Sequence, residues 1–125
     1  MPETIAKKIL IVEDSKELML GLATLLKSQG YLIVAAYDSL FGISLAHKEK
    51  PDLVILDIMM PQMDGYTFVE EMKNIKDVSP VPVIVLTVRE GIHKLLDKKI
   101  VVEYIVKPYD EVVLLKKIKE HLKIN

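Results

Sequence analysis

Short apolar runs alternate with longer amphipathic stretches along the whole chain. The apolar runs are compact and rich in β-branched residues, a composition typical of strands. The longer stretches repeat apolar residues every three or four positions, which is the spacing of one helical face. This pattern predicts five strands, over Lys8–Val12, Tyr31–Ala36, Leu53–Leu56, Val83–Thr87 and Val101–Val106.

Helices are predicted between the strands and after the last one. Ser15 can cap the first of them, and Gly30 stands where a glycine ends a helix. The buried face of that helix is predicted to hold Leu18, Leu22, Leu25 and Leu26. A second helix is expected over Ser39–Lys48, and a third after Asp64 and Gly65 with Phe68, Met72 and Ile75 on one face. A weaker helix is expected from about Ile92 to Lys98. The last helix should follow a cap at Asp110 and place Leu114, Ile118 and Leu122 on one face.

Five strands alternating with five helices indicate an α/β fold, a doubly wound parallel sheet with helices on both faces. The near-continuous apolar strands fit this class because a central parallel strand is buried on both sides. No internal linker, repeat or low-complexity segment interrupts the pattern. We therefore expect residues 1–125 to form one domain with a core of about 8–122.

Composition narrows the possible functions. Half of the 125 residues are hydrophobic, the formal net charge is −1, and there is no cysteine. The charge gives no electrostatic reason to expect direct nucleic-acid binding, and disulfide and thiol chemistry are excluded. The sequence has neither a signal-peptide pattern nor an apolar run long enough to span a membrane. We expect a soluble cytoplasmic protein that does not contact a membrane.

The polar residues that follow the strands define the candidate site. Glu13 and Asp14 follow the first strand, Asp57 the third, and Lys107 the fifth, while Thr87 ends the fourth. In open parallel sheets ligands bind beyond the carboxyl ends of the strands, so these side chains should gather at one edge. Three carboxylates at one edge need a positive partner. An all-oxygen ligand set favours a hard cation, and Mg²⁺ in particular because it leaves positions open for water and phosphate.

These residue types suit phosphoryl transfer. A carboxylate beside a cation can attack phosphorus as a nucleophile, and we assign that role to Asp57. Lys107 and the hydroxyl of Thr87 would stabilise negative charge on the transferred group.

The same segments resemble the motifs of bacterial two-component response regulator receiver domains. The similarity covers about Lys8 to Leu122, and its motifs are specific only when taken together. It rests on Ile9-Leu10-Ile11-Val12-Glu13-Asp14, Leu56-Asp57-Ile58-Met59-Met60-Pro61, Asp64-Gly65, Thr87 and Tyr104-Ile105-Val106-Lys107-Pro108. The resemblance implies a flavodoxin-like sheet with strand order 2-1-3-4-5.

The resemblance also implies a role for each matching residue. Asp57 would accept a phosphoryl group from a histidine of a sensor kinase or phosphotransfer protein, and the domain would catalyse both its own phosphorylation and its own dephosphorylation. Mg²⁺ would be held by Asp14 and Asp57 directly, by Glu13 mainly through water, and by the backbone carbonyl of Met59. Lys107 would bind the phosphoryl group and precede a cis bond to Pro108.

Two further residues would transmit the conformational change that follows phosphorylation of Asp57. Thr87 would move inward to the phosphoryl oxygen, and Tyr104 would turn inward as the aromatic switch that alters affinity for a downstream partner. A tyrosine in a strand is also often simply packed.

Other functions stay open at this point. A pseudo-receiver, a protein interaction module that is never phosphorylated, would keep the same fold. A related aspartate-nucleophile phosphatase would need a second acid where Met59 stands. A flavin-binding domain would need a phosphate loop rich in glycine and hydroxyl groups after the first strand, which this chain lacks.

The chain departs from the family pattern at several positions. Val88 replaces a small residue and should narrow access to Asp57, while Met59 and Arg89 occupy positions that set how fast the acyl phosphate hydrolyses. Ile100-Val101-Val102-Glu103 stands where Gly-Ala-Asp-Asp is common. The three histidines, His47, His93 and His121, are expected to be solvated.

Overall fold

The five predicted strands form one parallel sheet. The computed structural model describes residues 6–57, 65–74, 81–88 and 100–122. Its strands are β1 (Lys8–Val12), β2 (Leu32–Ala36), β3 (Leu53–Asp57), β4 (Val83–Thr87) and β5 (Val101–Val106). Their order across the sheet is β2-β1-β3-β4-β5, and every neighbouring pair is parallel. The predicted fold class and strand order are confirmed.

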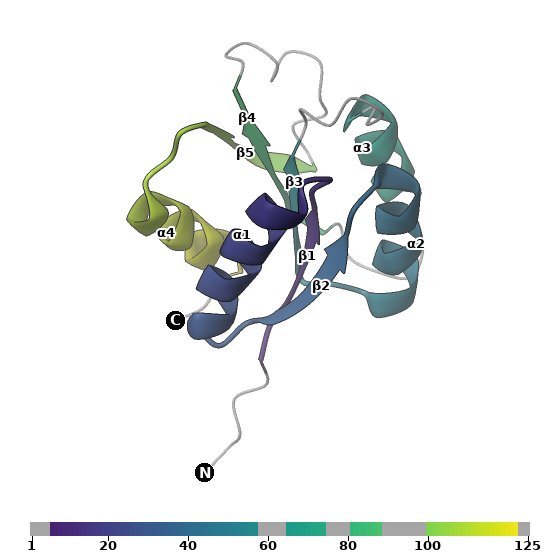
Figure 1. Ribbon diagram of the computed structural model, residues 1–125. Coiled ribbons are helices and arrows are strands. Elements are labelled where there is room, and N and C mark those ends of the chain that lie inside the picture. Colours follow the sequence, from purple (N-terminus) through teal and green to yellow (C-terminus); the bar gives the residue numbers. More distant parts are fainter. Residues whose placement is uncertain (1–5, 58–64, 75–80, 89–99, 123–125) are drawn as a thin grey trace.

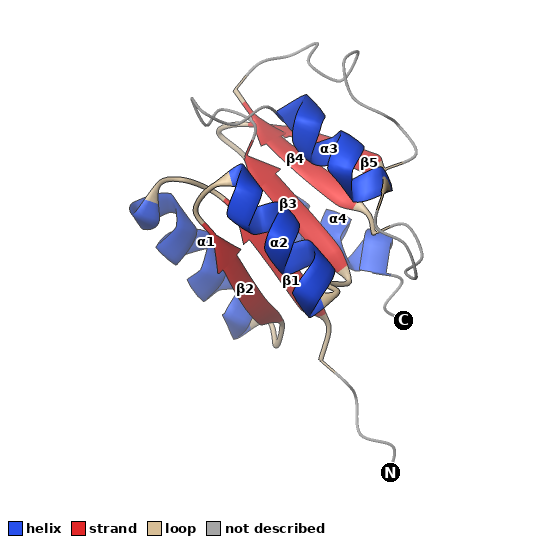
Figure 2. Cartoon of the chain, turned by 90° about the vertical axis from the view of Figure 1, so that its right-hand side faces the viewer, coloured by secondary structure: helices blue, strands red, loops and turns tan. Residues whose placement is uncertain are grey.

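Helices cover both faces of this sheet. Those in the described residues are α1 (Lys16–Ser28), α2 (Ser39–Glu49), α3 (Gly65–Lys73) and α4 (Glu111–Leu122). Figure 1 shows α1 and α4 on one side of the sheet and α2 and α3 on the other. The turned view in Figure 2 shows the same division, with α2 and α3 in front of the strands. The weaker helix predicted near Ile92–Lys98 lies outside the described residues.

Each face of the sheet has its own hydrophobic core because strand side chains alternate between the two faces. On the face under α1 and α4, Ile9, Ile11 and Ile55 pack with helix residues such as Leu26 and Ile118. On the opposite face, Leu10, Val12, Leu56 and Val85 pack against Phe68 of α3. The central strands β1, β3 and β4 are buried on both sides, which explains their continuous apolar sequences.

The predicted helix boundaries follow the sequence signals. The Ser15 hydroxyl accepts a hydrogen bond from the Leu18 N–H, and Asp110 accepts from Val112 at 2.7 Å. Gly30 has a φ of +92°, a conformation that L side chains rarely adopt, directly after the α1 C-cap.

The predicted buried face of α1 is partly wrong. Leu18 is 55% exposed, whereas Met19, Leu22, Ala23 and Leu26 face the sheet. The error arose because the leucine spacing suggested a stripe that begins one position too early. The sequence could not show that the flexible Met19 side chain, rather than Leu18, fills the core position.

Of the two histidines in the described residues, one is not freely solvated. His47 is exposed, as expected, and His93 lies outside the described residues. The Nε2 atom of His121, on α4, lies 2.9 Å from Oε2 of Glu103 on β5. The prediction for His121 was wrong because it treated the last helix alone and did not consider the neighbouring strand.

In the part of the chain that the structure describes, no helix is long and apolar enough to cross a membrane.

Candidate functional site

The carboxyl ends of β1, β3 and β4 bring three buried polar side chains to one edge of the sheet. Glu13 and Asp57 are each 4% exposed, and Thr87 is 1% exposed. Asp57 pairs with Leu86 in the register between β3 and β4, so Thr87 stands one residue further along the neighbouring strand. Buried polar groups of this kind require partners, because burial of an unpaired charge carries a large energetic cost.

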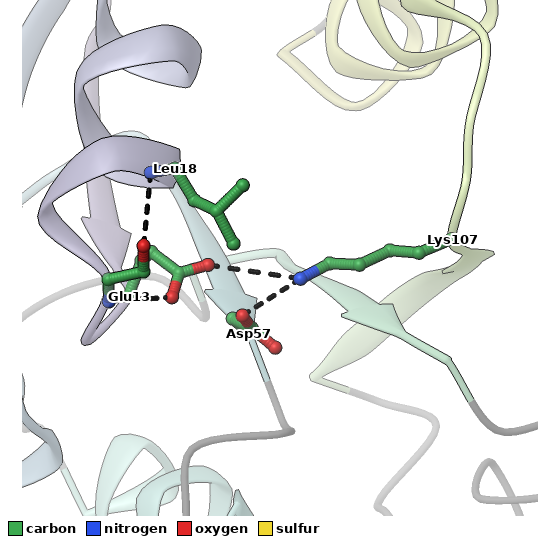
Figure 3. Close-up of polar contacts among 5 residues, drawn as sticks. Glu13, Leu18, Asp57 and Lys107 are labelled. Carbon is green, nitrogen blue, oxygen red and sulfur yellow. Dashed lines mark hydrogen bonds and ion pairs between the residues drawn. The ribbon is translucent and has the colours of Figure 1, made fainter.

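Lys107 supplies a positive partner for two acids. Its Nζ atom lies 2.9 Å from Oδ2 of Asp57 and 3.8 Å from Oε1 of Glu13. Figure 3 shows the lysine side chain reaching between the two carboxylates. The backbone holds this residue in place, because the Lys107 N–H donates to the Thr87 carbonyl at 2.7 Å. The bond between Lys107 and Pro108 is cis. The cis bond that the resemblance implied is therefore present.

Glu13 is held from the helix side as well. Its Oε2 atom accepts a hydrogen bond of 3.0 Å from the backbone N–H of Ser15. Burial raises the pKa of Glu13 from 4.5 to about 8, and the neighbouring Asp57 adds to this increase, while the Ser15 hydrogen bond opposes it. The two neighbouring acids disfavour each other's negative charge, which Lys107 partly offsets.

Asp14 differs from the other two acids because its side chain is exposed. It follows Glu13 at the start of the turn into α1, and its proximity also raises the pKa of Glu13. The site therefore offers oxygen atoms from Glu13, Asp14 and Asp57, a set that suits a small hard cation. The predicted ligand Met59 lies outside the described residues.

Tyr104 and Thr87 share a face of the sheet. Tyr104 is partly buried against the core under α2 and α3, the same core that contains Val83 and Val85. Strand alternation places Thr87 on the side of these two valines. Tyr104 pairs with Val85, two residues before Thr87 on the adjacent strand. This neighbouring position is what the switch hypothesis for Tyr104 needs.

A cavity of about 520 Å³ opens beside the acids. Three charged residues line it, Glu13 and Lys107 of the site and Glu111 at the start of α4. The other lining residues come from α1, the end of β4 and the segment after Lys107; they are Leu18, Leu22, Leu86, Val88, Pro108 and Tyr109. Sequence reasoning did not find Leu18 or Tyr109 as residues beside the site. The only available signal for Leu18 was its position three residues after the helix cap, which favours the first turn of α1 near the strand ends.

Comparisons with known proteins identify the family of this chain. A family model described as the response regulator receiver domain matches residues 9–119. The chain belongs to this family. It is 35% identical over 113 residues to protein PilH of Pseudomonas aeruginosa, an alignment that covers 89% of this chain and 93% of PilH.

Solved receiver structures have the same architecture. A CheY-like receiver domain protein from Methanospirillum hungatei is 26% identical with a TM-score of 0.86, and the alignment covers 95% of both chains. The receiver domain of the sensor histidine kinase PA1611 from P. aeruginosa, solved with magnesium in its active-site cleft, is 23% identical with a TM-score of 0.84. That alignment covers 96% of this chain and 100% of the PA1611 receiver domain, and it supports the shared fold.

Proposed function

We propose that this receiver domain accepts a phosphoryl group on Asp57 in a magnesium-dependent reaction and thereby changes its affinity for a partner. The observation that carries the proposal is the 2.9 Å contact between Lys107 Nζ and Asp57 Oδ2, in a site with a second buried acid. This contact fixes the orientation of the Asp57 carboxylate. It also keeps the Lys107 ammonium close to the phosphoryl group that Asp57 would accept.

The chemistry assigned to Asp57 is nucleophilic displacement at phosphorus. A carboxylate oxygen forms the new O–P bond while the N–P bond of a phosphohistidine breaks and the imidazole nitrogen keeps the electron pair. Lys107 and Thr87 would donate hydrogen bonds to the phosphoryl oxygens, where charge is spread during transfer. The domain would also provide the groups that later allow water to hydrolyse the acyl phosphate.

Magnesium fits the donor set described above. Asp14, Asp57 and Glu13 would hold it, with Asp14 and Asp57 bound directly and Glu13 mainly through water, and the Met59 carbonyl as a further ligand. The bound ion would neutralise negative charge shared by the acids and the phosphoryl oxygens. A related receiver domain carries magnesium in its active-site cleft, which supports the same choice of ion here.

The phosphoryl donor would be a sensor histidine kinase or a histidine phosphotransfer protein. The consequence of phosphorylation would be a shift between two conformations, with Thr87 drawn toward the phosphoryl group and Tyr104 following on the same face of the sheet. Ligand-linked shifts of this kind typically change partner affinity by about 1–3 kcal/mol.

Phosphoramidate provides a direct test because its P–N bond resembles that of phosphohistidine. With Mg²⁺ the wild-type chain should gain a phosphoryl group, and with EDTA it should not. Asp14→Ala should weaken Mg²⁺ or Mn²⁺ binding more than Glu13→Ala, because Asp14 is expected to bind the ion directly and Glu13 mainly through water. A folded wild type that stays unmodified at saturating Mg²⁺ would favour the pseudo-receiver, a binding module without phosphorylation.

A further inference from the structure

The loop between β1 and α1 joins a helix cap to one of the buried acids. Within this loop, Ser15 uses its backbone N–H and its side chain for different purposes. The N–H donates to Glu13 Oε2 at 3.0 Å, and the hydroxyl oxygen accepts from the Leu18 N–H at 3.2 Å. The Ser15 carbonyl accepts the first hydrogen bond of the helix, from Met19 at 2.9 Å. Ser15 is therefore fixed to α1 at two points and holds Glu13 at a third.

This arrangement determines which oxygen of Glu13 faces the site. Since Oε2 is engaged by Ser15, the other oxygen, Oε1, is the one that lies 3.8 Å from Lys107 Nζ. In Figure 3 the carboxylate of Glu13 lies between the start of α1 and the lysine. A rotation of the Ser15 peptide would release Oε2 and leave the Glu13 side chain free to change rotamer.

We propose that Ser15 is a positioning residue for the cation site, whose side-chain cap keeps its own backbone N–H directed at Glu13. The inference rests on the proposed function, because it assumes that the Glu13 carboxylate contributes to magnesium binding. Partners that orient a metal-binding carboxylate commonly affect affinity by about 10–100-fold. The donor N–H remains in a Ser15 variant, so a smaller loss of roughly three- to tenfold is expected.

The test compares Ser15→Ala with wild type in the full chain. Mn²⁺ binding is measured by EPR of the free hexaaqua ion, and acetyl phosphate is used to measure phosphorylation rate against Mg²⁺ concentration. Ser15→Ala should raise the Mn²⁺ dissociation constant roughly three- to tenfold. It should also raise the Mg²⁺ concentration at which the phosphorylation rate is half-maximal. The rate at saturating Mg²⁺ should stay close to that of wild type.

Asp38→Ala is the matched control, because Asp38 caps α2 in the same way. Its Oδ1 atom accepts from the Phe41 N–H at 2.7 Å, and neither residue lines the cavity beside the acids. This variant should lose helix-cap stability but bind Mn²⁺ as wild type does. Ser15→Thr, which retains a capping hydroxyl, should restore wild-type affinity. Ser15→Gly, which costs little helix stability, should still weaken binding if the role is positioning.

Different failures have different meanings. Wild-type Mn²⁺ affinity in both Ser15→Ala and Ser15→Gly would overturn the positioning role, as would an equal loss in Asp38→Ala. If Asp14→Ala and Glu13→Gln also bind Mn²⁺ as wild type does, the cation site itself has been assigned wrongly and the proposed function fails with it.

Discussion

At the scale of single residues, the ionisation of Glu13 links the candidate site to stability. Its pKa is raised by burial from 4.5 to about 8, so the folded chain binds a proton that the unfolded chain releases at lower pH. The contribution of Glu13 to the free energy of unfolding is complete below pH 4.5 and is lost as the pH rises through about 8. In EDTA, stability should therefore fall across this range.

Glu13→Gln should flatten that decline, because glutamine keeps a similar shape and cannot release a proton. The measurement is urea unfolding of both proteins in EDTA at a series of pH values from 5 to 8, with the difference between the two slopes as the result. Comparison of the two slopes removes the contribution of other titrating groups. Parallel slopes would show that Glu13 titrates similarly in the folded and unfolded chains.

Val88 is predicted to limit the approach of small phosphoryl donors. Val88 lines the cavity that Lys107 also lines, and the residue is 52% exposed. Val88→Ala should raise the initial rate of phosphorylation by acetyl phosphate roughly two- to fivefold, a barrier change of about 0.4–1 kcal/mol. Val112→Ala on α4, an exposed position that does not line the cavity, is the control. Equal rates for Val88→Ala and wild type would contradict this role.

Single residues differed in how well the sequence revealed them. Asp57 and Lys107 were identified because each follows a clear strand, and the structure brings their charged atoms together. The hydrogen bond from Ser15 to Glu13 was not predicted, since it depends on the rotation of one peptide group. Leu18 was placed in the core from its spacing, whereas it lines the cavity. Met59 and Arg89 lie outside the described residues, so their expected effects on hydrolysis stay predictions.

At the scale of elements, the packing of α2 depends on a glycine. A Cβ atom at Gly42 would lie 3.0 Å from Cγ2 of Val12 and 3.2 Å from Cε2 of Phe68, both in the core. Gly42→Ala should therefore push α2 away from β1 and α3 and destabilise the fold by about 1–3 kcal/mol.

Gly21→Ala gives the opposite expectation. Gly21 lies in α1, and a Cβ there would meet nothing within 4 Å. Alanine should stabilise this helix by about 0.5–1 kcal/mol because it loses less backbone entropy on folding. Urea unfolding of both variants measures the contrast, and a stabilised Gly42→Ala would contradict the close packing of α2.

The contact between β5 and α4 shows where prediction from separate elements stops. The register between β4 and β5 shifts so that Ile84 pairs with Glu103, leaving Val102 as an extra residue. Val102 then packs on the α4 side, and Glu103 reaches His121 at 2.9 Å on the same side. A strand read with strict alternation places these two residues on opposite faces. The bulge turns the Glu103 side chain toward α4, and no local sequence signal predicted this bulge.

At the scale of the whole molecule, the fold was more predictable than the site. The strands could be located because buried parallel strands have continuous apolar sequences, and their alternation with helices fixed the α/β class. The parallel arrangement then required the strand-terminal acids and Lys107 to meet at one edge. The strand order came from the family resemblance, because apolar strands alone do not specify their neighbours. The apolar cavity was missed because α1, β4 and the Lys107 segment build it together.

The central claim is that this receiver domain carries its phosphoryl group on Asp57. The most direct measurement is intact mass after incubation with Mg²⁺ and acetyl phosphate, followed by fragmentation that locates the modified residue. Wild type should gain the mass of one phosphoryl group at Asp57, and Asp57→Asn should gain none while remaining folded. A phosphoryl group on Asp57→Asn at the wild-type level, or fragments that place it on another residue of the wild type, would contradict the account.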